Sequence, residues 1–260
     1  MTTPLLNRVK QIGYKNPKQL WNLVCLLYPI TYVILVPVSL YSTKYSKQIS
    51  EIWFVKFLEN YIVRNYMILW FSILYFINLL QFHNLQISIS LKDQSTIKNF
   101  KIYVINVIWL IILLEWFFGS PIFERISIAL GAFCSKTEFY TEYKCLKENG
   151  KWINLFDSSS HYTMLISNSL LIWNLIIPFI STKLLKYKSN DLEEAAGFQQ
   201  EINDNDDSYN IKKYIVYLSI LFIVLWYISF VITSLFFHTI LEKLVGLVCG
   251  MTIPLLIQFI

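Results

Sequence analysis

Charged side chains are scarce in this 260-residue sequence. Only 15% of the residues are Asp, Glu, Lys or Arg, whereas 55% are hydrophobic and 17% are aromatic. A soluble domain usually carries about 25% charged residues. Glycine and proline are also sparse, at 7 each, and no internal repeat is visible. The apolar residues occur in long blocks rather than at the 3.6-residue period of a soluble helix. The composition therefore excludes an ordinary soluble domain and indicates an integral membrane protein.

Uninterrupted apolar blocks give the positions of the expected membrane spans. A helix needs about 20 apolar residues to cross the hydrocarbon core. Four segments of that length contain no charge, and two further segments are shorter or contain one acid. The sequence therefore predicts an all-α fold, in which residues 1–260 form one polytopic bundle of six transmembrane helices. The expected spans are 20–42, 65–86, 102–118, 160–181, 214–237 and 243–260, each uncertain by a few residues.

The net charge of +5 is explained by membrane topology, and no nucleic-acid partner is expected. Bases in short loops beside apolar blocks usually orient a membrane protein. The N-terminal tail holds four bases and no acid, which favours a cytosolic N-terminus and, with six spans, a cytosolic C-terminus. These bases are Arg8, Lys10, Lys15 and Lys18. Membrane lipids are the expected surroundings.

The two large loops between the expected spans differ in composition. Residues 191–207, within an expected cytosolic linker of residues 189–211, carry seven acids and no base. This pattern is typical of a solvated linker, and the alternative is a docking segment for a cytosolic partner. The expected lumenal loop, residues 119–157, has mixed charges, aromatic residues, Cys134 and Cys145. In an oxidising lumen these cysteines are candidates for a disulfide, and two free thiols are the alternative.

The chain has only 3 His, and two of them are expected at the same membrane surface. His161 opens the fourth span and His238 closes the fifth, so the six-span count places both on one side. That side is the lumenal one if the N-terminus is cytosolic. His83 follows the second span and is expected at the opposite surface.

His161 and His238 are both predicted to lie beside helix N-termini. Asp157 and three serines precede His161 and are good N-cap residues. The sequence TILE at residues 239–242 indicates a capping box that opens the sixth span. Free backbone N–H groups and the positive end of the helix dipole make such places good anion sites.

Two histidines at an anion site suit phosphoryl transfer. One imidazole can attack phosphorus and form a phosphohistidine, while the other protonates the leaving oxygen. Asp157 is a candidate to hold an imidazolium, and Lys243 is a candidate to offset phosphate charge. The alternative is that each histidine is an interfacial residue with a satisfied hydrogen bond. No metal site is expected, because no carboxylate cluster accompanies the pair and such sites normally need three or four ligands.

Two motifs carry a family resemblance. FDSSSHYTMLISNSLLIW at residues 156–173, followed by SLFFHTILEKLVGLVCG at residues 234–250, resembles the fat storage-inducing transmembrane (FIT) family. The resemblance extends from the third span to the C-terminus and includes GKWINLFD at residues 150–157. The modest length is similar to that of the smaller fungal members.

The resemblance implies a fold and an activity. FIT proteins are six-span endoplasmic reticulum proteins with cytosolic termini, and they resemble lipid phosphatases. Members cleave fatty acyl-CoA to acyl 4′-phosphopantetheine and adenosine 3′,5′-bisphosphate, and they support lipid droplet formation and phospholipid balance. For this chain the expected substrate is long-chain acyl-CoA, and no cofactor is expected. The two functional histidines of the family match His161 and His238. By analogy with the lipid phosphatases, His238 is the expected nucleophile and His161 the expected general acid.

One departure from the family pattern concerns the site itself. Ser160 stands where the family usually has glycine, which permits closer backbone approach. Ser160 is therefore a candidate substrate-binding position that alters activity. The basic motifs of the lipid phosphatases are not evident, so the group that neutralises the phosphates is open. Two alternatives to catalysis also remain: a non-catalytic lipid-binding protein, and a membrane scaffold whose acidic linker recruits partners.

Overall fold

The computed structural model describes residues 17–82, 94–114, 122–136, 141–153, 160–194 and 207–257. These residues are almost entirely helical. The only strands among them, β1 (Phe133–Cys134) and β2 (Trp152–Ile153), form one short antiparallel pair. Helices are the expected result of long apolar blocks, because a backbone in lipid must satisfy its hydrogen bonds internally. The predicted all-α polytopic membrane fold is therefore confirmed.

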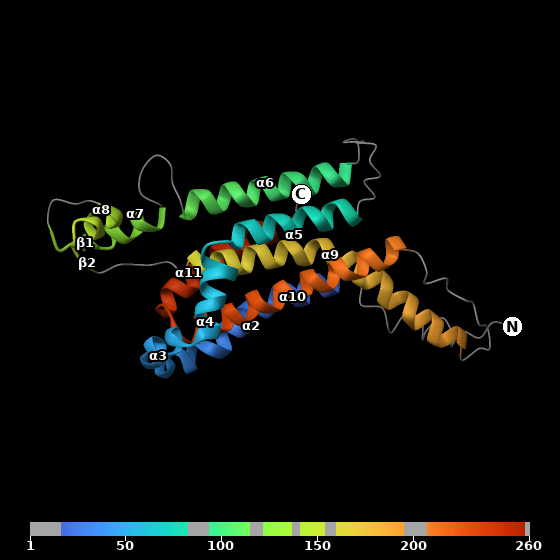
Figure 1. Ribbon diagram of the computed structural model, residues 1–260, viewed down its shortest axis with the longest axis horizontal. Coiled ribbons are helices and arrows are strands. Elements are labelled where there is room, and N and C mark those ends of the chain that lie inside the picture. Colours follow the sequence, from blue (N-terminus) through green and yellow to red (C-terminus); the bar gives the residue numbers. More distant parts are fainter. Residues whose placement is uncertain are drawn as a thin grey trace.

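Six long helices in the described part of the chain each overlap one expected span (Figure 1). They are α2 (Pro17–Ser42), α5 (Met67–Phe82), α6 (Gln94–Leu114), α9 (Ser160–Glu194), α10 (Asp207–Phe236) and α11 (Ile240–Leu256). Four candidate spans are long and apolar enough by themselves, and the bent pair Trp53–Arg64 and Met67–Gln81 makes a fifth. Because α11 has only 17 residues, the count of six spans stays a prediction.

Helix α9 lies at the centre of the bundle. It packs against α2, α5, α10 and α11, and 72% of its candidate span is buried inside the protein. Polar side chains join it to its neighbours: the Tyr28 hydroxyl of α2 bonds the Ser169 hydroxyl, and Asn106 of α6 donates to Asn168. Such bonds and close packing hold helices together in a bilayer, where lipid tails remove the hydrophobic driving force.

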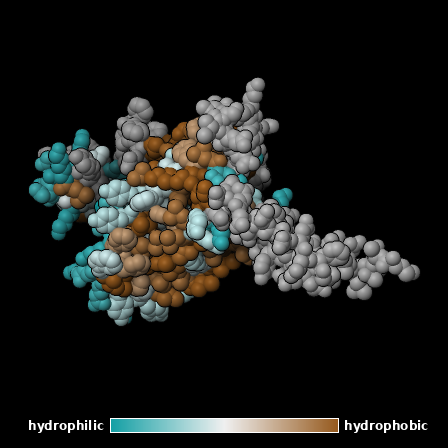
Figure 2. All heavy atoms as spheres, turned by 45° about the vertical axis from the view of Figure 1, so that its right-hand side comes forward, coloured by the Kyte–Doolittle hydropathy of each residue, from teal (hydrophilic) through white to brown (hydrophobic). Residues whose placement is uncertain are grey.

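The outer faces of the bundle are apolar. Val33 and Ile34 of α2 and Leu221 of α10 are more than half exposed, as are other large hydrophobic side chains. Figure 2 shows hydrophobic side chains over the middle of the molecule, with hydrophilic ones gathered at one end. A soluble protein rarely exposes apolar patches of this extent, so this surface is the one that faces lipid.

Short elements connect α2 to α5 at the end of the bundle where α11 begins (Figure 1). They are η1 (Thr43–Tyr45), α3 (Ser46–Glu51), α4 (Trp53–Phe57) and η2 (Leu58–Arg64). The η2 segment is a π-helix, a rare conformation that is frequent at functional sites. It contacts α5, α9 and α10, and the pair α4–η2 and α5 is bent by 63°.

The expected linker of residues 189–211 is partly helical. Helix α9 continues to Glu194, and α10 begins at Asp207. Both ends of the acidic segment therefore extend the flanking spans beyond the apolar core. Residues 195–206 lie outside the described part of the chain.

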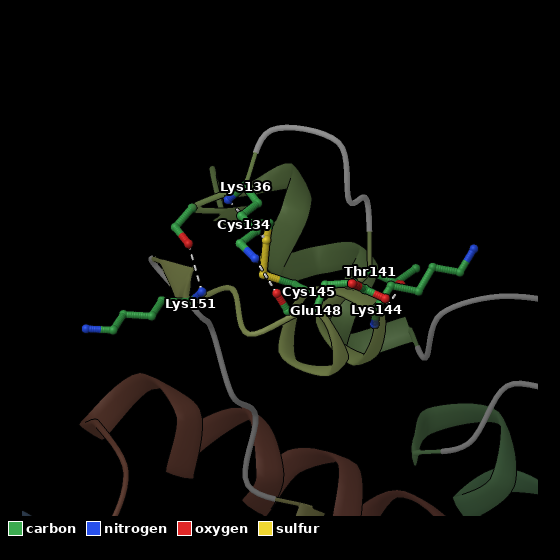
Figure 3. The surroundings of a disulfide bond; sticks show 8 residues. Cys134, Lys136, Thr141, Lys144, Cys145, Glu148 and Lys151 are labelled. Atoms are coloured by element: carbon green, nitrogen blue, oxygen red, sulfur yellow. Dashed lines mark hydrogen bonds between the residues drawn. A yellow bond between two sulfur atoms is a disulfide. The ribbon is translucent and has the colours of Figure 1, made fainter.

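The described part of the 119–157 loop is an ordered unit held by a disulfide (Figure 3). It contains α7 (Ile122–Ala129), β1, α8 (Glu142–Lys147) and β2. A disulfide between Cys134 and Cys145 joins β1 to α8. These are the two cysteines that the sequence analysis gave as disulfide candidates. Gly150 passes over this bond, where an added Cβ would lie 2.7 Å from one sulfur and 2.8 Å from the other.

Loss of the disulfide is expected to loosen this unit without unfolding the bundle. The bond closes a loop with a sequence separation of 11, and such bonds typically contribute about 2–4 kcal/mol. Cys134→Ser should therefore speed amide hydrogen exchange across residues 122–153, whereas Cys249→Ala should not. Thiol labelling of the denatured, unreduced wild type should modify two of the 4 Cys. Labelling of all four would contradict the bond.

Candidate functional site

His161 is the second residue of α9. It follows Ser160, the first residue of the helix, and precedes Tyr162, which is fully buried. The Tyr162 hydroxyl bonds the Ser234 hydroxyl of α10, and the Tyr162 ring packs on Phe230. These contacts fix the first turn of α9 against α10. The position of the His161 imidazole is therefore set by the packing of two central helices.

His238 lies in the three-residue turn between α10 and α11 and has an unusual backbone. Its φ is +59°, in the left-handed region that residues other than glycine seldom adopt. Such conformations persist only where the surroundings impose them, and they cluster at active sites. Here the surroundings include the capping box of α11, in which Thr239 accepts from the Glu242 backbone and donates its own N–H to Glu242 Oε2 at 2.6 Å. The capping box predicted from TILE is confirmed.

The Glu242 carboxylate also faces His238. Its Oε2 lies 3.8 Å from Nδ1 of the imidazole, and the two side chains are 9% and 16% exposed. One oxygen thus caps the helix and contacts the imidazole of the same turn. A carboxylate near Nδ1 orients the ring and leaves Nε2 on the opposite side. The geometry is suited to a histidine that reacts through Nε2.

Lys243 is placed differently from the sequence interpretation. Its side chain is buried, and Nζ donates to the Ser234 carbonyl at 2.8 Å. It is not among the described residues that line the cavity containing the two histidines. The contact fastens the start of α11 to the end of α10, on either side of His238. The structure therefore favours a role for Lys243 in holding this turn rather than in binding phosphate.

A close contact joins α9 to α11 in the part of α9 that directly follows His161. Thr163 of α9 donates to the Gly246 carbonyl of α11 at 3.3 Å. One turn later, a Cβ at Gly250 would lie 2.9 Å from the Thr163 carbonyl oxygen and 3.0 Å from Ile166 Cβ. Glycines four residues apart allow this approach of two membrane helices. The helix that carries His161 and the helix that follows His238 are thereby packed backbone to backbone.

The two histidines line one cavity of about 660 Å³. It lies among α4, η2, α5, α6, α9 and α10, and His238 acts electrostatically on His161. The polar lining comprises Glu59, Arg64, Asn65, Ser160, His161, Ser229, Thr233 and His238. The apolar lining comprises Val55, Leu58, Val63, Met67, Ile68, Leu110, Ile111, Met164, Ile232 and Phe237. The cavity can therefore hold a molecule with a polar, anionic part and an apolar part.

The family model described as "Fat storage-inducing transmembrane protein", FIT, matches residues 55–258. The chain belongs to the FIT family. The matched region contains both histidines and every described residue of the cavity lining. The family predicted from the two histidine motifs is therefore confirmed.

Two curated FIT relatives are similar to part of the chain. Acyl-coenzyme A diphosphatase YFT2 of Saccharomyces cerevisiae is 27% identical over 148 residues, which cover 55% of this chain and 47% of that protein. Acyl-coenzyme A diphosphatase FITM2 of Caenorhabditis elegans is 22% identical over 138 residues, covering 52% and 45%. The chain spans about half the length of the curated relatives it matches. No solved structure matches it.

Within this FIT protein, the structure brings together three of the residues singled out from the sequence. His161, His238 and Ser160 line the same cavity. Asp157 lies outside the described residues. Among the described residues, no group of three or more His, Cys, Asp or Glu is placed to hold a metal ion.

Sequence reasoning missed the contribution of the η2 segment to the FIT cavity. Glu59 and Arg64 are five residues apart, and in an α-helix such residues lie on different faces. In the π-helix they form an ion pair, with 3.8 Å between Arg64 Nη1 and Glu59 Oε1. The sequence feature that marks this segment is a group of charged residues between two apolar blocks, and that pattern alone does not identify a π-helix.

Proposed function

We propose that this FIT protein is an acyl-CoA diphosphatase of the endoplasmic reticulum. It would cleave the phosphoanhydride of long-chain acyl-CoA to give acyl 4′-phosphopantetheine and adenosine 3′,5′-bisphosphate. The observation that carries the proposal is that His161 and His238, from separate helix ends, line one cavity whose remaining wall is largely apolar. The names of the two curated relatives add support for the reaction class.

The chemistry follows from the positions of the two imidazoles. Nε2 of His238 attacks one phosphorus of the anhydride, forming an N–P bond while the P–O bond to the bridging oxygen breaks. His161, protonated once the negative phosphates of the substrate offset the nearby charge of Arg64, gives its proton to that oxygen. Water then attacks the phosphohistidine and transfers a proton to His161, and the N–P bond breaks. Each group returns to its starting state, so no cofactor is consumed.

The local structure of His238 assists the first step. The Glu242 carboxylate faces Nδ1, which favours the tautomer with its proton on Nδ1 and a free electron pair on Nε2. It also stabilises the positive charge that the ring acquires on attack. Glu242 is therefore a positioning residue, because it acts through the imidazole rather than on the substrate.

The membrane setting fits an amphiphilic substrate. Apolar side chains of α5, α6 and α9 line part of the cavity, and they give an acyl chain an environment like that of the bilayer. We place the site at the lumenal surface of a six-span bundle with cytosolic termini. The activity would support lipid droplet formation and phospholipid balance, and the 189–211 segment is the candidate docking site for a cytosolic partner.

The test is product analysis with purified protein in mixed micelles. Palmitoyl-CoA should give palmitoyl 4′-phosphopantetheine and adenosine 3′,5′-bisphosphate in equal amounts by mass spectrometry. Free coenzyme A should be a much poorer substrate, because it lacks the apolar part that the cavity accepts. Tight binding of palmitoyl-CoA with no turnover would instead favour a non-catalytic lipid-binding protein. Cleavage at the thioester would contradict the proposed reaction.

A further inference from the structure

One base faces the cavity besides the histidines. Among the described lining residues, Arg64 is the only lysine or arginine. It lies at the end of the π-helix η2, and its charge acts on the His161 imidazole. Lys243, the base singled out from the sequence, is directed to the Ser234 carbonyl instead. The cavity therefore has one fixed positive charge beside the proposed general acid.

Arg64 is paired with an acid of the same cavity. Glu59 Oε1 lies 3.8 Å from Arg64 Nη1, and the two side chains are 42% and 65% exposed. Both residues are lining residues, so both face the space that a substrate would fill. An exposed ion pair of this length contributes little to stability. An incoming phosphate can therefore take the place of the carboxylate at small cost.

The chemistry of arginine matches an anhydride. The planar guanidinium presents several N–H donors in a fork that fits two phosphate oxygens at once. Acyl-CoA carries a pyrophosphate between its apolar and nucleotide parts, so the substrate brings several negative charges to the histidines. Without a cation, the Glu59 carboxylate in the same cavity would repel the negatively charged phosphates of the substrate.

We propose that Arg64 is the residue that binds the pyrophosphate of the substrate, and that Glu59 holds it in the empty site and competes with that phosphate. This inference rests on the proposed function for the identity of the substrate. It gives the two members of one ion pair opposite effects on substrate binding. A purely structural ion pair would give them the same effect, because either substitution breaks the same contact.

The experiment is a double-mutant cycle with palmitoyl-CoA in mixed micelles. Arg64→Gln should raise KM about tenfold, because a charge-assisted contact to phosphate is lost. Glu59→Gln should lower KM about twofold to threefold, in line with release of an exposed ion pair. In the Arg64→Gln background, Glu59→Gln should no longer lower KM. Arg64→Lys should recover part of the affinity as a point charge. Lys47→Gln, an exposed base of α3 outside the cavity lining, is the matched control.

Binding of inorganic pyrophosphate provides a second readout that needs no turnover. Calorimetry on wild type and Arg64→Gln, each checked for an unchanged melting temperature, should show weaker binding by the variant. The inference is overturned if Arg64→Gln keeps the wild-type KM, or if Arg64→Gln and Glu59→Gln raise KM equally. Neither outcome would contradict the diphosphatase activity itself. If the wild type cleaves no acyl-CoA, the proposed function fails, and equal pyrophosphate affinities would then overturn the inference by themselves.

Discussion

His161→Ala should reduce acyl-CoA hydrolysis by about 10²–10⁴-fold, the usual contribution of a positioned proton-transfer group, and His238→Ala should reduce it by at least as much. His238→Ala should be the more severe, because it removes the atom that forms the N–P bond. His161→Ala removes only the proton donor, and the leaving group is a phosphate that departs partly without help. Steady-state rates with palmitoyl-CoA give the magnitude.

The roles of the two histidines can be separated by their intermediates. Enzyme quenched in alkali during turnover should carry a phosphoryl adduct on His238 in the wild type. In His161→Ala the adduct should still form, more slowly, and in His238→Ala it should be absent. An adduct on His161 would reverse the assignment of nucleophile and acid.

The third histidine supplies the control for both variants. His83→Ala should hydrolyse palmitoyl-CoA at the wild-type rate, because the six-span count places His83 at the opposite surface. All three variants should melt within a few degrees of the wild type, which separates loss of chemistry from loss of fold. Wild-type turnover by both His161→Ala and His238→Ala would rule out the proposed mechanism.

Gly250→Leu should cost both stability and activity. A Cβ at this position would already lie 2.9 Å from the Thr163 carbonyl oxygen, so a larger side chain must push α11 away from α9. Overpacking of this kind costs about 1–3 kcal/mol. The shift also separates His238, which precedes α11, from His161 in the first turn of α9. Since a displacement of about 1 Å at a site can cost on the order of 10²-fold in rate, kcat should fall by at least tenfold.

Two companion variants test whether the close helix contact is responsible. Gly250→Ala should lie between wild type and Gly250→Leu in melting temperature and in kcat. Val248→Leu enlarges a neighbouring side chain of α11 that is 59% exposed, and it should leave both quantities unchanged. If Gly250→Leu kept wild-type turnover, α9–α11 packing would not control the distance between the histidines.

The positions of the long helices were predictable because the constraint is simple. Charges cannot remain in the hydrocarbon core without compensation, so the charge-free blocks of the sequence already locate α2, α5, α9 and α10. The ends were less predictable. Helix α9 continues to Glu194 and α10 begins at Asp207, because a helix can extend into water through polar residues that no hydropathy pattern marks.

The site was predictable in part. His161 and His238 were identified because each lies at the edge of an apolar block and span counting places both on one surface. The contribution of Arg64 depends on a π-helix, and its pairing with Glu59 is visible only once that backbone is known. Lys243 adjoins the capping box in sequence, yet its side chain turns toward α10. Sequence spacing gives the neighbours of a residue along the chain, and it does not give the direction of a long side chain.

The central place of α9 has a consequence for biosynthesis. Ser167, Asn168 and Ser169 are fully buried polar residues within the candidate span of this helix. Helices α10 and α11, which pack against α9, follow it along the chain and are translated after it. The hydrogen-bond partners of these residues, Tyr28 and Asn106, belong to α2 and α6, which precede α9 and are already made when it leaves the ribosome. The nascent chain can therefore bury these groups against α2 and α6 as soon as α9 enters the bilayer, which avoids their costly exposure to lipid, and α10 then completes the cavity.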